Sequence, residues 1–146
     1  MAEPTLPPAL ARLVRPGQGA VGIAARHVES GREWRWEDRR GFAAASLIKV
    51  PILAAFWTAV ERGALDPGER VRVPDSGRVD GSGVLQALAP DLAPTWRDLA
   101  TLMITVSDNT ATNLVIDRLG LVAIQAWIDL AGLGATRCGR RMRDAA

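Results

Sequence analysis

The stretch Phe42-Ala-Ala-Ala-Ser-Leu-Ile-Lys-Val-Pro-Ile-Leu53 decides how this chain is interpreted. It is apolar apart from Ser46 and Lys49. It begins a longer run of helical character, so a helix is expected over Ala43–Arg62 with Gly63 as the glycine that ends it. Because residues three apart lie on one face of a helix, the hydroxyl of Ser46 and the amine of Lys49 are predicted to be within side-chain reach of each other.

This Ser-x-x-Lys pair is suited to nucleophilic catalysis. A serine hydroxyl is a weak nucleophile until a neighbouring base removes its proton. The apolar surroundings of Lys49 disfavour its ammonium form, and Lys49 is the one lysine among 18 basic residues. A helix start also favours an oxyanion, to which the backbone N–H of Ser46 can donate. The alternative is that Ser46 only caps the helix and Lys49 is solvated.

A second candidate motif, Ser107-Asp108-Asn109, stands at a break between two expected helices. Here Ser107 can pass a proton to a leaving nitrogen, Asn109 can hold a substrate carbonyl, and Asp108 can fix the turn by accepting backbone N–H groups. The alternative is a plain helix cap, because Ser, Asp and Asn are favoured just before a helix.

A glycine-rich loop, Gly81-Ser-Gly-Val-Leu-Gln86, is the third candidate. Its glycines allow a tight turn that can form one wall of a pocket. It is not a phosphate-binding loop, because neither a lysine nor a GxGxxG pattern follows it. A plain surface loop is the alternative.

The rest of the pattern predicts an α+β fold. A β-hairpin is expected from Ala20–Val28 and Arg32–Trp36, with a turn at 29–31. Two strands alone are marginal in water, so the face that carries Trp34 and Trp36 needs a cover. The predicted helices are a short one over 6–14, one that begins at a Thr95/Asp98 capping box and runs to Val106, and two over Thr110–Leu119 and Leu121–Leu130.

Composition excludes several kinds of site. The chain has one histidine, one cysteine and no tyrosine, so it contains no zinc-spaced Cys/His cluster, no internal disulfide and no tyrosine base. No metal site built from Cys and His is therefore expected. His27 is interpreted as a structural or exposed residue at the end of a strand, and Cys138 as a free thiol.

Charge and hydropathy narrow the partners and the location. The 18 basic residues are scattered among 16 acidic ones and leave a net charge of +2, which argues against a nucleic-acid partner. No stretch approaches the length of a membrane span. Prolines interrupt residues 1–20, where a signal peptide would need an apolar run, so a cytoplasmic location is expected for the sequence as written.

Taken in order, the three motifs resemble those of the class A β-lactamase family of serine hydrolases. Phe42–Leu53 looks like the family's nucleophile helix, Gly81–Gln86 like the loop before its pocket helix, and Asp98–Asn113 like the helix that leads into its Ser-Asp-Asn turn. The resemblance implies a β-lactamase/transpeptidase-like α+β fold, a small-molecule β-lactam substrate and an acyl-enzyme intermediate without a cofactor.

The resemblance also implies a role for each matching residue. Ser46 would be the acylated nucleophile, Lys49 would help to deprotonate it, and Ser107 would pass a proton to the β-lactam nitrogen. Other Ser-x-x-Lys proteins, namely penicillin-binding D-Ala-D-Ala peptidases, esterases and glutaminases, are alternatives, as is an inactive remnant. The remaining implied roles are substrate binding for Asn109 and Gly83 and a structural role for Asp108.

Two parts of the family pattern are absent from this sequence. In the family, a Glu on a later loop activates the deacylating water, and a later strand carries Lys-Thr-Gly. Here Asp144 is the last acidic residue and no second lysine exists. The chain is therefore expected to be truncated at its C-terminus, with weak acylation and a persistent acyl-enzyme.

The expected domain is accordingly a partial one over 1–146, with an N-terminal helix and hairpin in 1–40 and a helical part in 41–146. Its unfinished sheet leaves an edge at which a second copy or a complementing chain is expected to pair. Members of the family are usually periplasmic or secreted, in contrast to the location expected from residues 1–20.

Overall fold

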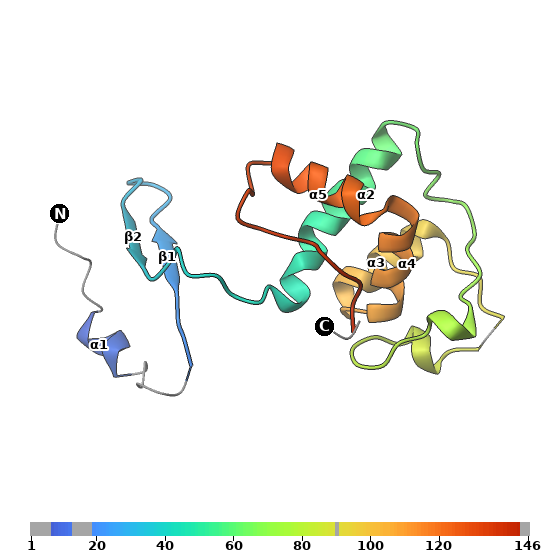
Figure 1. Ribbon diagram of the computed structural model, residues 1–146, viewed down its shortest axis with the longest axis horizontal. Helices are drawn as coiled ribbons and strands as arrows, with labels where there is room; N and C mark the ends of the chain where they lie inside the picture. The colour runs from blue at the N-terminus through green and yellow to red at the C-terminus, as the bar shows by residue number, and fades with distance from the viewer. Residues whose placement is uncertain (1–6, 13–18, 90, 144–146) are drawn as a thin grey trace. The chain divides into compact units, whose positions relative to one another are not determined.

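The computed structural model describes residues 7–12, 19–89 and 91–143, which fall into two compact units (Figure 1). The first unit lies within Met1–Ala43 and the second within Ala44–Ala146. The first contains a short helix and a hairpin, and the second contains the helices that carry the candidate site residues.

The first unit contains the predicted hairpin. Strands β1 (Ile23–Arg26) and β2 (Glu33–Trp36) pair antiparallel, with Ile23 opposite Trp36 and Arg26 opposite Glu33. Along β2 the two tryptophans are half-buried and the alternate residues are exposed, as the period-two pattern predicts. Pairing of this hairpin with a second copy or a complementing chain stays a prediction.

Helix α1 spans Pro8–Ala11 and is shorter than the helix expected over 6–14. Residues 6, 13 and 14 lie outside the described part of the chain. The helix begins with a proline in its first turn, where the missing N–H has no intrahelical partner to lose.

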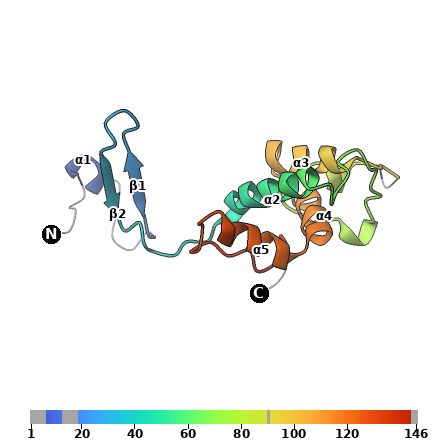
Figure 2. The same ribbon diagram turned by 90° about the horizontal axis from the view of Figure 1, so that it is seen from above.

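The second unit is a cluster of helices in which α2 (Lys49–Glu61) contacts each of the others (Figures 1 and 2). The others are α3 (Trp96–Thr105), α4 (Asn109–Leu119) and α5 (Leu121–Leu130). They bury a common apolar core, which excludes water from the side of α2 that carries Lys49. Fully buried members of this core are Ile52, Phe56, Leu85, Leu99, Met103, Val115, Ile124 and Ile128.

The start of helix α2 differs from the sequence prediction. A helix was expected from Ala43, whereas the chain forms a 3₁₀ turn over Ala45–Ile48 and enters the α-helix at Lys49. The expected start is wrong because Ala45 has φ of +46°, a left-handed conformation that a right-handed helix cannot include. The predicted end is confirmed, since Gly63 follows the helix with φ of +70°.

The ends of α3 and α4 are set by side-chain caps. The predicted capping box of α3 is confirmed: Thr95 Oγ1 accepts from Asp98 N at 3.1 Å, and Thr95 N donates to Asp98 Oδ2 at 2.9 Å. The hydrogen bond from Thr95 N, together with the one from the Thr95 hydroxyl, holds the pKa of the Asp98 carboxyl below its ordinary value. Helix α4 begins one residue earlier than expected, at Asn109, because Asp108 Oδ1 accepts from Ala111 N.

The segment between α2 and α3 is mostly loop. The alternating piece expected over 69–73 forms a single bridge, between Arg70 and Thr95. The expected loop over 75–83 is interrupted by one 3₁₀ turn at Asp75–Gly77 and followed by another at Leu85–Ala87.

Within the described residues no single helix has the length and apolar character of a membrane span, although α4 and α5 meet that test as a pair bent by 86°.

The capping box predicts a measurable contribution to stability. Thr95→Ala removes the acceptor for Asp98 N and should lower the free energy of unfolding by about 1 kcal/mol in urea denaturation. Thr101→Ala is the matched control, because Thr101 is an exposed residue within the same helix and alanine has the higher helix propensity. An equal loss in both variants would contradict the assignment.

Candidate active site

The centre of the candidate site is the buried amine of Lys49, of which 2% is exposed. Its Nζ donates to the carbonyl oxygen of Ser107 at 2.6 Å, to Ser107 Oγ at 2.9 Å and to Asn109 Oδ1 at 2.9 Å. Ser107 Oγ in turn donates to Ser46 Oγ at 2.9 Å. The 3₁₀ turn before α2, the start of α2 and the turn between α3 and α4 therefore bring Ser46, Lys49, Ser107 and Asn109 together.

Ser107 lies between the predicted nucleophile and the predicted base. An ammonium has three donors, and all three hydrogen bonds of Lys49 go to the 107–109 turn. Within the described residues, Lys49 is linked to Ser46 through the hydroxyl of Ser107 and by no direct hydrogen bond. Ser46 itself is exposed, whereas Lys49 is buried.

The environment of Lys49 lowers the affinity of its amine for a proton. Burial lowers the pKa of the Lys49 amine, and the negative charge of Asp108 offsets part of this effect. A lysine whose pKa is lowered holds its proton less tightly and becomes a better general base near neutral pH.

Backbone strain is found on both sides of the Ser46–Ser107 contact. Ala45 has φ of +46° and Ser107 has φ of +55°. A left-handed conformation costs a residue with a side chain roughly 1–2 kcal/mol. Such strain persists only where the surrounding structure enforces it, and it is concentrated at functional sites. In this strained conformation, both the carbonyl oxygen and the hydroxyl of Ser107 accept from the amine of Lys49.

Asp108 holds the glycine-rich loop against α4. Its Oδ2 accepts from Val84 N at 2.7 Å and from Leu85 N at 2.9 Å, while Oδ1 caps the helix. Gly83 makes this approach feasible, because a Cβ there would lie 2.3 Å from Asp108 Cγ and the residue has φ of +119°. The geometry supports a structural role for Asp108, and a contact between Gly83 and substrate stays a prediction.

A model of the β-lactamase enzyme family matches residues 5–146. The chain belongs to this family. Among curated relatives, the β-lactamase PSE-4 of Pseudomonas aeruginosa is 25% identical over 100 residues, which cover 68% of this chain and 34% of the relative.

Solved structures of this family and of a penicillin-binding protein share the fold. A β-lactamase from Sphaerobacter thermophilus is 38% identical, with a TM-score of 0.76 over 78% of this chain and 43% of that one. The protein PBP-A is 33% identical, with a TM-score of 0.83 over 93% and 52%. A variant of PBP-A, solved as an acyl-enzyme complex with penicillin G, is 35% identical, with a TM-score of 0.78 over 84% and 47%.

An ancestral class A β-lactamase is 27% identical, with a TM-score of 0.83 over 92% of this chain and 52% of the ancestral one. These neighbours confirm the expected class A resemblance and the β-lactamase/transpeptidase-like α+β fold. The chain spans about a third of the length of the curated relative and about half that of the solved proteins.

The family motifs did not reveal a second buried asparagine close to the site. Asn113 lies one helical turn after Asn109 on α4 and is 1% exposed. Its Oδ1 accepts from Met142 N at 2.7 Å and its Nδ2 donates to Met142 O at 3.2 Å, so it fixes the segment that follows α5. Its spacing of four residues from Asn109 was the available signal, since both lie on one face of the helix.

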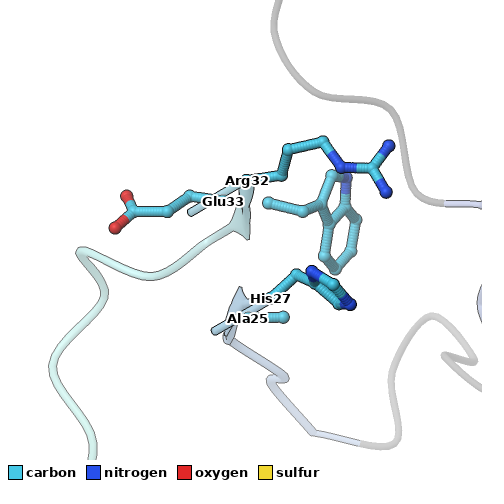
Figure 3. Close-up of a pocket in the computed structure, with 5 residues that line it drawn as sticks. Ala25, His27, Arg32 and Glu33 are labelled. Atoms are coloured by element: carbon cyan, nitrogen blue, oxygen red, sulfur yellow. The ribbon is translucent and has the colours of Figure 1, made fainter. Parts of the chain in front are cut away.

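His27 belongs to the hairpin, where a shallow pocket of about 360 Å³ is lined by Ala25, His27, Arg32, Glu33 and Trp34 (Figure 3). His27 Nδ1 is 2.8 Å from Ser30 Oγ but also accepts from Ser30 N, so the turn occupies the nitrogen that a Ser-His pair would need. Within the described residues, no group of His, Cys, Asp and Glu could hold a metal ion.

Cys138 is buried, and its burial raises the pKa of its thiol. A raised pKa keeps the thiol protonated and so disfavours the reactive thiolate. This agrees with its interpretation as an unreactive residue.

The close approach of Gly83 to Asp108 predicts a large effect of a single methyl group. Gly83→Ala should lower the free energy of unfolding by about 3 kcal/mol or more, through backbone strain and overlap with Asp108 together. Gly132→Ala is the control, because Gly132 also has a positive φ of +76° but has no atom within 4 Å of the added Cβ. Equal losses on urea denaturation would show that overlap with Asp108 is unimportant.

The burial of Lys49 predicts its titration. Because the chain contains one lysine, lysine labelled with ¹³C at Cε gives a single NMR signal, whose titration should yield a pKa below the ordinary value of 10.5. Between the two values the folded chain binds fewer protons than the unfolded chain, so the free energy of unfolding should rise with pH across this window. A Lys49 pKa equal to that of the urea-unfolded chain would contradict this.

Proposed function

We propose that this chain is a serine hydrolase of the β-lactamase/transpeptidase type, in which a β-lactam acylates Ser46. The observation that carries the proposal is the hydrogen-bonded series from Ser46 Oγ through Ser107 Oγ to the buried Nζ of Lys49. Membership of the β-lactamase enzyme family supports the reaction class.

Acylation requires that the proton of Ser46 reach Lys49. With Lys49 as a neutral amine, the two hydroxyls rotate so that Ser46 donates to Ser107 and Ser107 donates to Nζ. As Ser46 Oγ bonds to the β-lactam carbonyl carbon, its proton moves to Ser107 and the proton of Ser107 moves to Lys49. The product of this step is a tetrahedral oxyanion beside a Lys49 ammonium.

Breakdown of the oxyanion returns the proton. The carbonyl re-forms, the C–N bond of the ring breaks, and Ser107 gives its proton to the departing nitrogen. Lys49 then restores the proton of Ser107 and is neutral again. Atoms and charges balance without a cofactor, and the same hydroxyl serves the proton transfer in both directions.

The first turn before α2 supplies a donor for the oxyanion. Ser46 lies in the 3₁₀ turn Ala45–Ile48, and the first N–H groups of a helix have no intrahelical partner. The backbone N–H of Ser46 is therefore proposed as one oxyanion donor. The loss of a single such donor typically costs about 10²–10³ in rate, so the efficiency of acylation depends on how many donors surround the oxyanion.

Hydrolysis of the acyl-enzyme is proposed to be slow. Among the described residues, no carboxylate forms a hydrogen bond with Ser46, Lys49 or Ser107. The nearest acid in sequence, Asp108, uses both oxygens to accept backbone N–H groups. The same observation favours a second candidate function, a penicillin-binding protein that is acylated without rapid turnover, and the likeness to PBP-A supports it.

Mass spectrometry of the intact chain incubated with penicillin G tests the proposal. We expect an adduct of one penicillin per chain, mapped to Ser46 by peptide analysis, that decays slowly after removal of the drug. Ser46→Ala should form no adduct. Ser30→Ala is the matched control and should react like the parent, because Ser30 contacts His27 on the hairpin.

An adduct that survives in Ser46→Ala, or its absence from folded parent protein, would contradict acylation at this residue. The rate of decay separates the two candidate functions. Loss of the adduct within seconds, with release of hydrolysed drug, would favour a β-lactamase, and persistence for hours would favour a penicillin-binding protein.

A further inference from the structure

Arg78 closes the base of the loop formed by residues 79–84, which overlaps the glycine-rich loop Gly81–Gln86. From the residue before the loop, its Nη1 donates to the carbonyl oxygens of Leu85 and Leu88, the latter at 2.8 Å, and its Nη2 donates to Ala89 O at 2.9 Å. Its Nε lies 3.4 Å from Asp75 Oδ1, and 13% of the side chain is exposed. One planar guanidinium therefore ties the two ends of the 79–84 loop together.

The loop that Arg78 closes touches the first residues of α4 at several points. Ser82 O accepts from Asn109 N at 3.0 Å, and Asp80 O accepts from Asn109 Nδ2 at 3.2 Å. A Cβ on Gly81 would lie 2.9 Å from that same Nδ2. The loop thus packs directly against the side-chain amide of Asn109.

This packing determines which way the Asn109 amide faces. An asparagine side chain has one accepting end and one donating end, and rotation by half a turn exchanges them. The carbonyl of Asp80 can only accept, so it holds Nδ2 on the loop side. Oδ1 must then face Lys49. In its ammonium form the Nζ of Lys49 is a donor and has no lone pair with which to accept.

We propose that Arg78 is a positioning residue for the site: by bracing the 79–84 loop, it holds the amide of Asn109 in the orientation that accepts from Lys49. Without the brace, the carbonyl of Asp80 moves relative to α4 and the amide loses its fixed partner. The amide then samples orientations that present Nδ2 to the amine. The consequence of this motion for acylation rests on the proposed function, whereas the orientation of the amide does not.

The chain offers a matched control for Arg78. Arg70 Nη1 also donates to a backbone carbonyl, that of Ala93 at 2.8 Å, but Ala93 lies outside the loop that contacts Asn109. Arg70→Met and Arg78→Met therefore remove the same chemical group from two different backbone sites. Arg78→Lys keeps the charge but lacks the planar fork that spans several carbonyls.

Solvent exchange of the side-chain amides tests the brace directly. The chain contains two asparagines, so ¹⁵N-asparagine labelling gives two side-chain NH₂ groups, those of Asn109 and Asn113. Asn113 is bonded to Met142 rather than to the loop and serves as an internal reference. In Arg78→Met we expect the side-chain NH₂ of Asn109 to exchange with solvent about tenfold faster than in the parent, because the loop opens locally and no longer protects it. The exchange of Asn113 should be unchanged.

Each outcome bears on the proposal. Faster exchange at Asn109 alone, absent from Arg70→Met, supports it. Parallel loss of protection at Asn109 and Asn113 would reveal general destabilisation and overturn the proposal, as would an Asn109 amide protected as in the parent. If Arg78→Met does not fold, Arg78→Lys decides by the same comparison.

The rate of penicillin G acylation supplies the functional reading. In Arg78→Lys we expect acylation to slow about tenfold, since small displacements of reacting groups have large effects on rate, with Arg70→Lys unchanged. If the parent is not acylated, the proposed function fails while the amide exchange still decides the role of Arg78. If the parent is acylated and Arg78→Lys reacts at the same rate with the Asn109 amide protected, the role of Arg78 fails and the proposed function stands.

Discussion

The ammonium of Lys49 has three hydrogens, and the fold supplies one oxygen for each of them. A buried charge costs several kcal/mol unless every donor is satisfied, so this small set of contacts constrains everything around it. All three acceptors belong to Ser107 and Asn109, which places the turn between α3 and α4 against the start of α2. The left-handed backbone at Ser107 accompanies the contact of both of its oxygens with the amine.

A second layer of polar contacts keeps the acceptors in place. Asp108 lies between the two residues that bind the amine, yet it faces the other way and accepts the N–H groups of the loop and of α4. In the Ser107-Asp108-Asn109 motif, the first and third residues therefore bind Lys49, and the second holds the neighbouring loop and helix in place. The negative charge of the same carboxylate raises the pKa of Lys49, so Asp108 contributes both to folding and to the protonation of Lys49.

Much of the site could be predicted from local sequence. The capping box of Thr95 and Asp98, the cap at Asp108 and the helix end at Gly63 each depend on residues close together in the chain, and the structure contains all three. The left-handed Ala45 could not be predicted, because an alanine among alanines carries no local signal for it.

The clamp of Asn113 on Met142 and the contacts of Arg78 were missed for a related reason. Each joins a side chain to backbone carbonyls or N–H groups, and backbone groups have the same chemistry at every position. A sequence pattern records which side chain is present and not which peptide group it will meet. Arginine on a loop is ordinarily a solvated residue, and only the three-dimensional arrangement distinguishes Arg78 from its neighbours.

The amine of Lys49 is held by a hydroxyl and two neutral carbonyl oxygens rather than by a carboxylate. A single reaction converts one kind of acceptor into the other, because hydrolysis of the Asn109 side-chain amide yields aspartate. The new negative charge would bind the ammonium more tightly and raise the pKa of Lys49, so the base would remain protonated. Deamidation of Asn109 would therefore strengthen its contact with Lys49 and at the same time replace the Nδ2 donor to Asp80 O by a carboxylate oxygen that can only accept, so the gain on one side of the residue is a loss on the other.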